Sequence, residues 1–240
     1  MTRMAFGTAL VGVCLANSAC ENIAGSPARP TAGGAAASAV NDAGPGAAAT
    51  GGAVADDEPV VRLTDLVPVG SSRLVRTPNG ISFNLSTTDL TPGDPYTLWF
   101  VVFNEPGQCA VPHECAPEDV VNDAAKPDLI YAAGRIAGGS GAATFAGRVG
   151  MGDTAGSVNL PVGLPSYGLL EPYDAEIHLA VHHHGPKLPE YMPDMIMTID
   201  GGCTDAGVPA AGVMSPWNQH PFGRRGPNTC ATIQAVVHRP

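Results

Sequence analysis

Residues 80–104 read GISFNLSTTDLTPGDPYTLWFVVFN, and their pattern decides the fold class. In GISFNLST (80–87), apolar residues alternate with small polar ones, which predicts a strand with one buried face. The segment 96–104 is apolar on both faces, which predicts a central strand covered on both sides. The intervening TPGDP holds residues that favour turns. This stretch therefore predicts β structure.

Short apolar runs of the same kind recur on either side of this stretch, separated by Gly, Pro, Asn and Asp, and no segment shows sustained helical periodicity. We expect further strands at 60–63, 128–133, 143–149, 175–184, 195–200 and 231–238. Residues 117–125 predict a short helix, because a proline precedes two acids in its first turn. The pattern predicts an all-β domain, an antiparallel β-sandwich of about 7–10 short strands with long Gly/Pro-rich loops.

The first twenty residues are typical of a secretory signal. Arg3 precedes an uncharged, mostly apolar run at 4–16, which is shorter than the roughly 20 residues that a spanning helix needs. Cys20 directly follows Ser18 and Ala19, as in a bacterial lipobox, although Asn17 stands where that pattern usually has Leu. We expect a lipid anchor at Cys20, with ordinary signal cleavage as the alternative.

Residues 21–55 are expected to form a disordered tether. This segment holds 13 Ala and 7 Gly, with no aromatic residue, so it has too little apolar surface to offset the entropy of ordering. The folded β-sandwich domain is then expected at 56–240, exported and either lipid-anchored in the cell envelope or secreted.

The charge balance excludes one class of partner. The 240 residues carry 22 acids and 12 bases, a formal net charge of −10, and only Lys126 and Lys187 are lysines. A surface for phosphate backbones needs clustered positive charge, so we expect no nucleic-acid partner.

The chain has six cysteines, and an exported chain enters an oxidising compartment that favours disulfides. Cys14 lies in the signal segment and Cys20 at the lipobox, which leaves an even number in the domain. For those four we expect two local disulfides, Cys109–Cys115 and Cys203–Cys230. A zinc site at these cysteines is the alternative, but their spacings do not match the usual short ligand spacings.

The segment 175–186, AEIHLAVHHHGP, is the one constellation that points to chemistry. With a period of two, Glu176, His178, His182 and His184 share one face of the expected strand. Residues two apart lie roughly 6.6–6.8 Å apart, so His182 and His184 can converge on one ion, whereas His178 lies roughly 13 Å from His182 and sits beside Glu176.

A complete site needs further ligands from other segments. The candidates are His113, His220, His238, Met192, Met195 and Met197. Imidazole with thioether favours copper over zinc, so copper is the first metal expected at such a site and zinc the second. The alternative is structural: the histidines form a polar network or a solvated strand end, and the methionines belong to the core.

Three blocks of the sequence carry a family resemblance: YTLWFVVFNEPGQC (96–109), AEIHLAVHHHGP with the downstream DGGC (200–203), and CATIQAVVHRP (230–240). They resemble a family of uncharacterised secreted bacterial proteins, which implies no activity. The spacing of His182 and His184 is also similar to the short H-x-H strands of copper/zinc superoxide dismutases and bacterial chordin-like β-sandwiches. The further histidine ligands of the dismutases are not recognisable, so that activity is not implied.

The sequence therefore favours a non-enzymatic binding or structural domain of the cell envelope. The esterase G-x-S-x-G, the phosphate loop, H-E-x-x-H and the EF-hand pattern are all absent from it. A copper- or zinc-binding protein is the second hypothesis, and a hydrolase or redox enzyme without a visible motif is the third.

Overall fold

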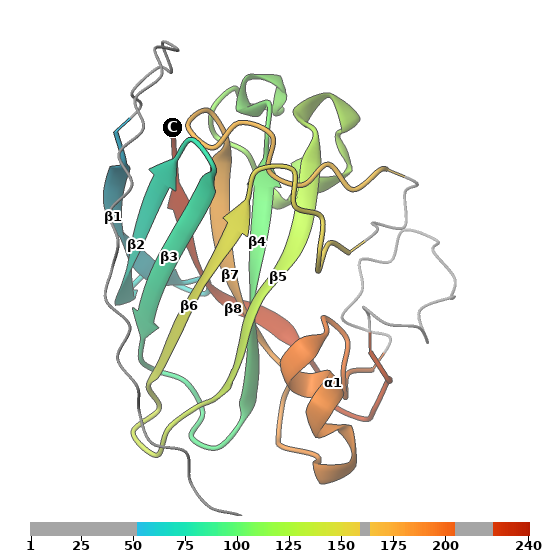
Figure 1. The fold of residues 1–240 in the computed structure, drawn as a ribbon. Coiled ribbons are helices and arrows are strands. Elements are labelled where there is room, and N and C mark those ends of the chain that lie inside the picture. The colour runs from blue at the N-terminus through green and yellow to red at the C-terminus, as the bar shows by residue number, and fades with distance from the viewer. Residues whose placement is uncertain (1–51, 159–163, 205–222) are drawn as a thin grey trace, which may run out of the picture. The chain divides into compact units, whose positions relative to one another are not determined.

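The computed structural model describes residues 52–158, 164–204 and 223–240 (Figure 1). Its strands are β1 (Val54–Arg62), β2 (Pro68–Thr77), β3 (Gly80–Thr87), β4 (Pro95–Phe103), β5 (Pro127–Ile136), β6 (Ala143–Gly150), β7 (Glu176–His183) and β8 (Ala231–His238). The α-helix α1 spans Met192–Met197, and short 3₁₀ helices span Pro106–Gln108, Pro117–Val121, Asp123–Ala125 and Pro189–Tyr191. The prediction of an all-β domain is confirmed.

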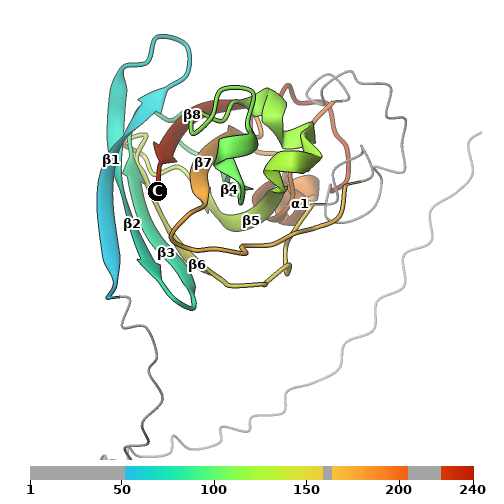
Figure 2. The same ribbon diagram turned by 90° about the horizontal axis from the view of Figure 1, so that it is seen from above.

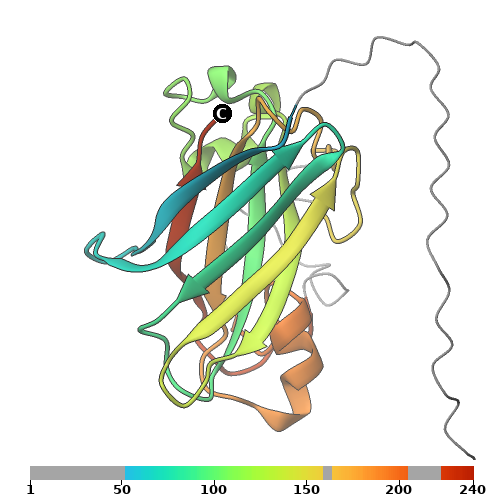
Figure 3. The same ribbon diagram turned by 60° about the vertical axis from the view of Figure 1, so that its left-hand side comes forward.

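The eight strands of the described chain form one antiparallel sheet in the order β5-β4-β7-β8-β1-β2-β3-β6. The sheet folds over so that its two four-stranded halves face each other, as Figure 2 shows from above. Figure 3 shows the half made of β1, β2, β3 and β6 from outside. Within the described residues, the strand pairing between the halves consists of two residue pairs of β1 and β8, Val61–Ala235 and Arg62–Gln234. The result is a nearly closed, barrel-like sheet, where the sequence predicted a sandwich.

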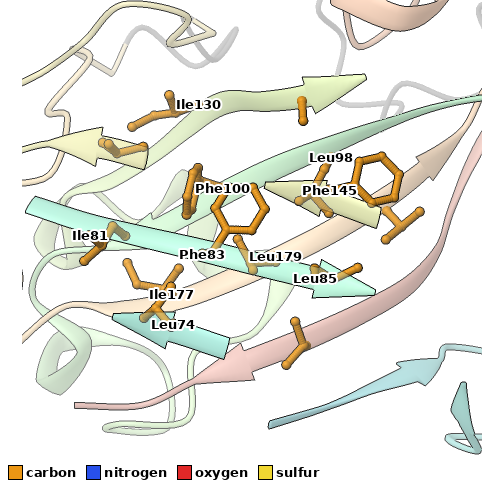
Figure 4. Close-up of a cluster of buried hydrophobic side chains, with 14 of the residues drawn as sticks. Leu74, Ile81, Phe83, Leu85, Leu98, Phe100, Ile130, Phe145, Ile177 and Leu179 are labelled. Atoms are coloured by element: carbon orange, nitrogen blue, oxygen red, sulfur yellow. The ribbon is translucent and has the colours of Figure 1, made fainter. Parts of the chain in front are cut away.

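The space between the halves holds the hydrophobic core (Figure 4). In β3 buried and exposed residues alternate, and Ile81, Phe83 and Leu85 point inward as their spacing predicted. The rings of Phe83 and Phe100 meet edge to face across the core, with centroids 5.0 Å apart. Each such large side chain contributes roughly 1.5–3 kcal/mol by leaving water, so this layer holds the two halves together.

Strand β4 is covered on both faces, which confirms the prediction from its sequence. Its inner face contributes to the core between the halves. On its outer face, Phe103 packs in a second cluster with Cys109, Cys115 and Ala125. Trp99 is also buried, and its ring meets that of Tyr131 on β5 edge to face.

Helix α1 lies over β4 and β5, where the sequence predicted a strand at 195–200, and that prediction is wrong. Two prolines, Pro189 and Pro193, start helical turns here, and Met195 is buried while Met197 is exposed. Apolar residues two apart in so short a run do not distinguish a strand from one turn of helix. Tyr131 donates its hydroxyl proton to the Ile196 carbonyl at 2.8 Å, which fixes the helix on the sheet.

One strand, one strand boundary and one helix also differ from the predictions. β2 was not predicted, because Ser72 and Arg76 point inward beside Leu74 and hide its apolar face. β1 begins at Val54, inside the expected tether. The expected helix at 117–125 is two consecutive 3₁₀ helices.

Both predicted disulfides are present. Cys109 and Cys115 have Cα atoms 5.2 Å apart, and Cys203 and Cys230 have Cα atoms 5.6 Å apart. The predicted signal, the lipid site Cys20 and almost all of the expected tether lie outside the described residues. Within the described residues, no helix combines the length and apolar character needed to cross a bilayer.

Candidate metal centre

Strand β7 lies between β4 and β8 in the middle of one half of the sheet, and it presents the histidines. Ile177, Leu179 and Val181 point into the core, as their alternation predicted. His183 ends that face: its ring stacks on Tyr96 at 4.7 Å, and its Nε2 lies 2.8 Å from an oxygen of Asp94. His183 interrupts the apolar pattern because its ring makes these two polar and aromatic contacts at the end of the core.

The first pair on the opposite face is Glu176 and His178. Their Oε1 and Nε2 atoms lie 2.7 Å apart, and the backbone N–H of Cys115 also donates to Oε1. The second carboxylate oxygen of Glu176 is buried and has no hydrogen-bond partner among the described residues. As the spacing predicted, this pair is separate from His182 and His184; it ties β7 to the Cys109–Cys115 loop.

His182 and His184 lie together, with ring centroids 5.0 Å apart. The chain turns sharply after them, because Gly185 has a φ of +72° and a Cβ there would lie 2.9 Å from the Cβ of Asn228. Asn228 donates its amide hydrogens to the carbonyls of His184 and Pro186, at 2.8 and 2.7 Å. This turn fixes the backbone of His184 directly after the end of β7.

The cysteines of the second disulfide complete the arrangement. Four buried residues each place one possible metal-ligand atom within 4.8 Å of the others: His182, His184, Cys203 and Cys230. We call these four residues the His/Cys cluster. His184 Nδ1 and Cys203 Sγ are 3.6 Å apart. Cys203 follows α1 and Cys230 precedes β8, so three separate segments meet here.

None of the other ligand candidates that the structure describes belongs to the His/Cys cluster. His113 is exposed in the Cys109–Cys115 loop, Met197 is 52% exposed, and His238 lies between Asp56 and Ser72. Met195 is buried and packs against the backbone of Gly202, next to the cluster. Met192 begins α1, and His220 is outside the described residues.

A chain of hydrogen bonds fixes the tautomer of His184. Trp99 Nε1 donates to Thr97 Oγ1 at 2.8 Å, and Thr97 Oγ1 lies 2.8 Å from His184 Nε2. The carbonyl of Gly201 lies 2.8 Å from His184 Nδ1 and can only accept. His184 therefore carries its proton on Nδ1, and the Thr97 hydroxyl donates to Nε2.

His182 is less completely satisfied. Its Nδ1 lies 3.3 Å from Thr232 Oγ1, while its Nε2 is buried and has no hydrogen-bond partner among the described residues. A buried polar atom without a partner lowers the stability of the fold by roughly 1–3 kcal/mol, and buried polar atoms are normally paired. The Nε2 atom of His182 therefore indicates a binding partner at this position.

Burial also sets the charge state of both imidazoles. Loss of solvation, with repulsion from His184 and His183, lowers the pKa of His182 to about 3. Loss of solvation lowers the pKa of His184 to about 4, against the opposing effect of the Gly201 carbonyl. Both rings are therefore neutral at pH 7, and neutral imidazole is the form that binds metals.

A second polar constellation joins the two halves of the sheet. His238 Nδ1 is hydrogen-bonded to Asp56, and its Nε2 lies 2.9 Å from Ser72 Oγ. The order of contacts is that of a Ser-His-Asp triad, and no sequence motif indicated it because the residues come from three strands. Ser72 is only 1% exposed and His238 is fully buried, so no substrate can reach the hydroxyl. We assign this network to stability.

No protein-family model, curated protein or solved structure matches this chain. The resemblance to secreted bacterial proteins and to dismutase-type sandwiches therefore stays a prediction.

Proposed function

We propose that this protein is a non-enzymatic binding domain of the cell envelope, exported and held at the membrane through Cys20, and that it binds a copper or zinc ion in the His/Cys cluster. The signal-like start, the lipobox-like Cys20 and the two disulfides support the location. The net charge of −10 favours cations over nucleic acids as ligands.

The observation that carries the metal assignment is the buried, unpartnered Nε2 of His182 among three other donor atoms. An ion bound there would satisfy that nitrogen. Once Cys203 and Cys230 are reduced to thiolates, they and the two imidazoles would match the donor sets of tetrahedral Zn²⁺ sites, and soft sulfur ligands also suit Cu⁺. Methionine sulfur would favour copper, whereas cysteine sulfur suits both copper and zinc.

Metal binding tests this proposal directly. The full chain, purified without an affinity tag, is incubated with Zn²⁺ or Cu⁺ before and after reduction, dialysed and analysed for metal. We expect a single ion per chain in at least one of the two states, and its loss in His182→Ala. The control is His113→Asn, which changes an exposed histidine and keeps a residue that tolerates the positive φ of that position.

Absence of stoichiometric metal in both states would overturn the metal assignment, as would a metal content that survives His182→Ala. Mass spectrometry of the mature N-terminus tests the anchor separately. An acylated Cys20 is expected, and an unmodified N-terminus elsewhere would contradict the membrane attachment.

A further inference from the structure

We propose that the Cys203–Cys230 disulfide and the metal ion exclude each other, so that the thiol–disulfide state of this pair switches the site. This inference rests on the proposed metal binding and adds its regulation. In the disulfide form the cluster is closed to metal; in the dithiol form Cys203, Cys230, His182 and His184 bind one Zn²⁺ or Cu⁺.

The disulfide form lacks usable ligands. Its sulfurs are bonded to each other and carry no thiolate charge, and the thiolate is the form of cysteine that binds metals. His184 Nδ1 carries the proton that it donates to Gly201, so it has no lone pair for an ion. Only His182 Nε2 remains, and one imidazole is a weak site for a divalent ion.

Reduction changes the two sulfur donors of the cluster, Cys203 and Cys230, from a disulfide to a pair of thiols. A dithiol reductant gives two electrons and two protons to the disulfide, yields two thiols and is itself oxidised to a disulfide. Zn²⁺ then displaces the two thiol protons and binds the thiolates. His184 Nδ1 already lies 3.6 Å from Cys203 Sγ, close to the roughly 3.5 Å between two ligands of one tetrahedral zinc ion with bonds of about 2.0–2.3 Å.

Thr97 allows His184 to change its tautomer. For Nδ1 to bind the ion, the proton has to sit on Nε2, which faces Thr97 Oγ1 at 2.8 Å. A hydroxyl oxygen has two lone pairs, so Thr97 can accept from both Trp99 Nε1 and His184 Nε2. Histidine ligands commonly donate their second N–H in this way, which orients the ring and raises its basicity.

The experiment compares the two redox states of the full chain by competition for Zn²⁺ with a chromogenic chelator, and by the thiolate charge-transfer absorption of bound Co²⁺. The reductant is a phosphine, which does not itself offer thiols. We expect the reduced protein to bind at least about 100-fold more tightly than the oxidised protein. Loss of two thiolate ligands should exceed the 10–100-fold effect of losing a residue that only supports a ligand.

The protein contains its own control. The Cys109–Cys115 disulfide lies near Glu176 and outside the His/Cys cluster, so Cys109→Ser with Cys115→Ser should leave the redox dependence intact. Cys203→Ser with Cys230→Ser should abolish it. Because that variant loses the stabilisation of a disulfide, His182→Ala provides a second test with the disulfide intact: reduction should then no longer produce tight binding.

The outcomes separate the two proposals. Equal affinity in both redox states would overturn the switch and leave the metal assignment standing. No binding in either state would overturn both. Binding in the reduced protein that persists in Cys203→Ser with Cys230→Ser would show that other groups hold the ion, and would also overturn the switch.

Discussion

At the scale of single residues, Thr97 holds the polar network behind the candidate site. It is fully buried and links Trp99 to His184, so a hydroxyl in the middle of an otherwise apolar strand has a definite role. Its replacement by a residue of the same shape removes two hydrogen bonds and leaves two buried nitrogens without partners.

We therefore expect Thr97→Val to lower the free energy of unfolding by about 2–4 kcal/mol, because an unpaired buried polar group costs roughly 1–3 kcal/mol. Urea denaturation measures this. Thr144→Val is the control, since Thr144 is exposed and its hydroxyl is hydrogen-bonded to the neighbouring hydroxyl of Ser86. A loss for Thr97→Val no larger than that of the control would contradict the role of the network.

The two buried imidazoles predict how stability depends on pH in the metal-free, disulfide-bonded protein. An unfolded histidine takes up a proton below its ordinary pKa of 6.5, while His182 and His184 stay neutral down to about 3 and about 4. The unfolded state thus binds more protons between pH 6.5 and about 4, so stability is complete above 6.5 and falls as the pH falls through that window.

Each histidine should contribute a slope of up to about 1.4 kcal/mol per pH unit in this window. Denaturation at a series of pH values measures the slope, and His182→Leu should remove one of the two contributions. An unchanged slope in that variant would show that His182 is not buried as a neutral ring.

At the scale of elements, the docking of α1 on the sheet positions one of the four members of the His/Cys cluster and a carbonyl that contacts another. The segment after α1 supplies the Gly201 carbonyl and Cys203. The helix approaches β5 so closely that a Cβ on Gly134 would lie 1.8 Å from the carbonyl oxygen of Ile196. Glycine is required here for this close approach of two backbones.

Gly134→Ala is expected to displace α1 and to cost about 1–3 kcal/mol or more, since backbone atoms cannot yield as a flexible side chain can. Amide hydrogen exchange in 192–203 should accelerate, and metal binding by the reduced protein should weaken. Gly139→Ala is the matched control, because a Cβ there meets open space. Unchanged exchange in Gly134→Ala would mean that α1 is not held against β5.

At the scale of the whole molecule, buried polar groups hold together the seam where β1 and β8 are paired through only two residue pairs. Arg76 reaches from β2 across this seam. Its guanidinium donates to the carbonyls of Pro172 and Ala175 at 2.8 Å, and to those of His238 and Arg239 at 3.2 Å. One buried side chain thus connects both halves of the sheet.

Arg76→Met should lower the free energy of unfolding by at least about 3 kcal/mol, because four carbonyls lose their donor. The control on the same strand is Arg73→Met. Arg73 points outward in an exposed ion pair with Asp57, which is worth at most about 1 kcal/mol. Similar losses for the two variants, measured by chemical denaturation, would contradict the role of Arg76 in closing the seam.

The sequence by itself determined the all-β class, the strands that alternate cleanly and the pairing of His182 with His184, and it favoured the two local disulfides that the structure contains. These follow from local physics: a period of two places residues on a face, and short spacings limit which groups can meet. β2 could not be predicted for the same reason, because its inward residues include Ser72 and Arg76, whose burial depends on partners distant in the sequence.

Only the tertiary structure decided that the two halves join into one nearly closed sheet and that the histidines meet Cys203 and Cys230. Both depend on contacts between segments far apart in the chain, such as the β1–β8 pairs and the docking of α1. The sequence offered several candidates for the remaining ligands, and no local pattern ranks them, since the position of a ligand is set by the packing of elements rather than by spacing along the chain.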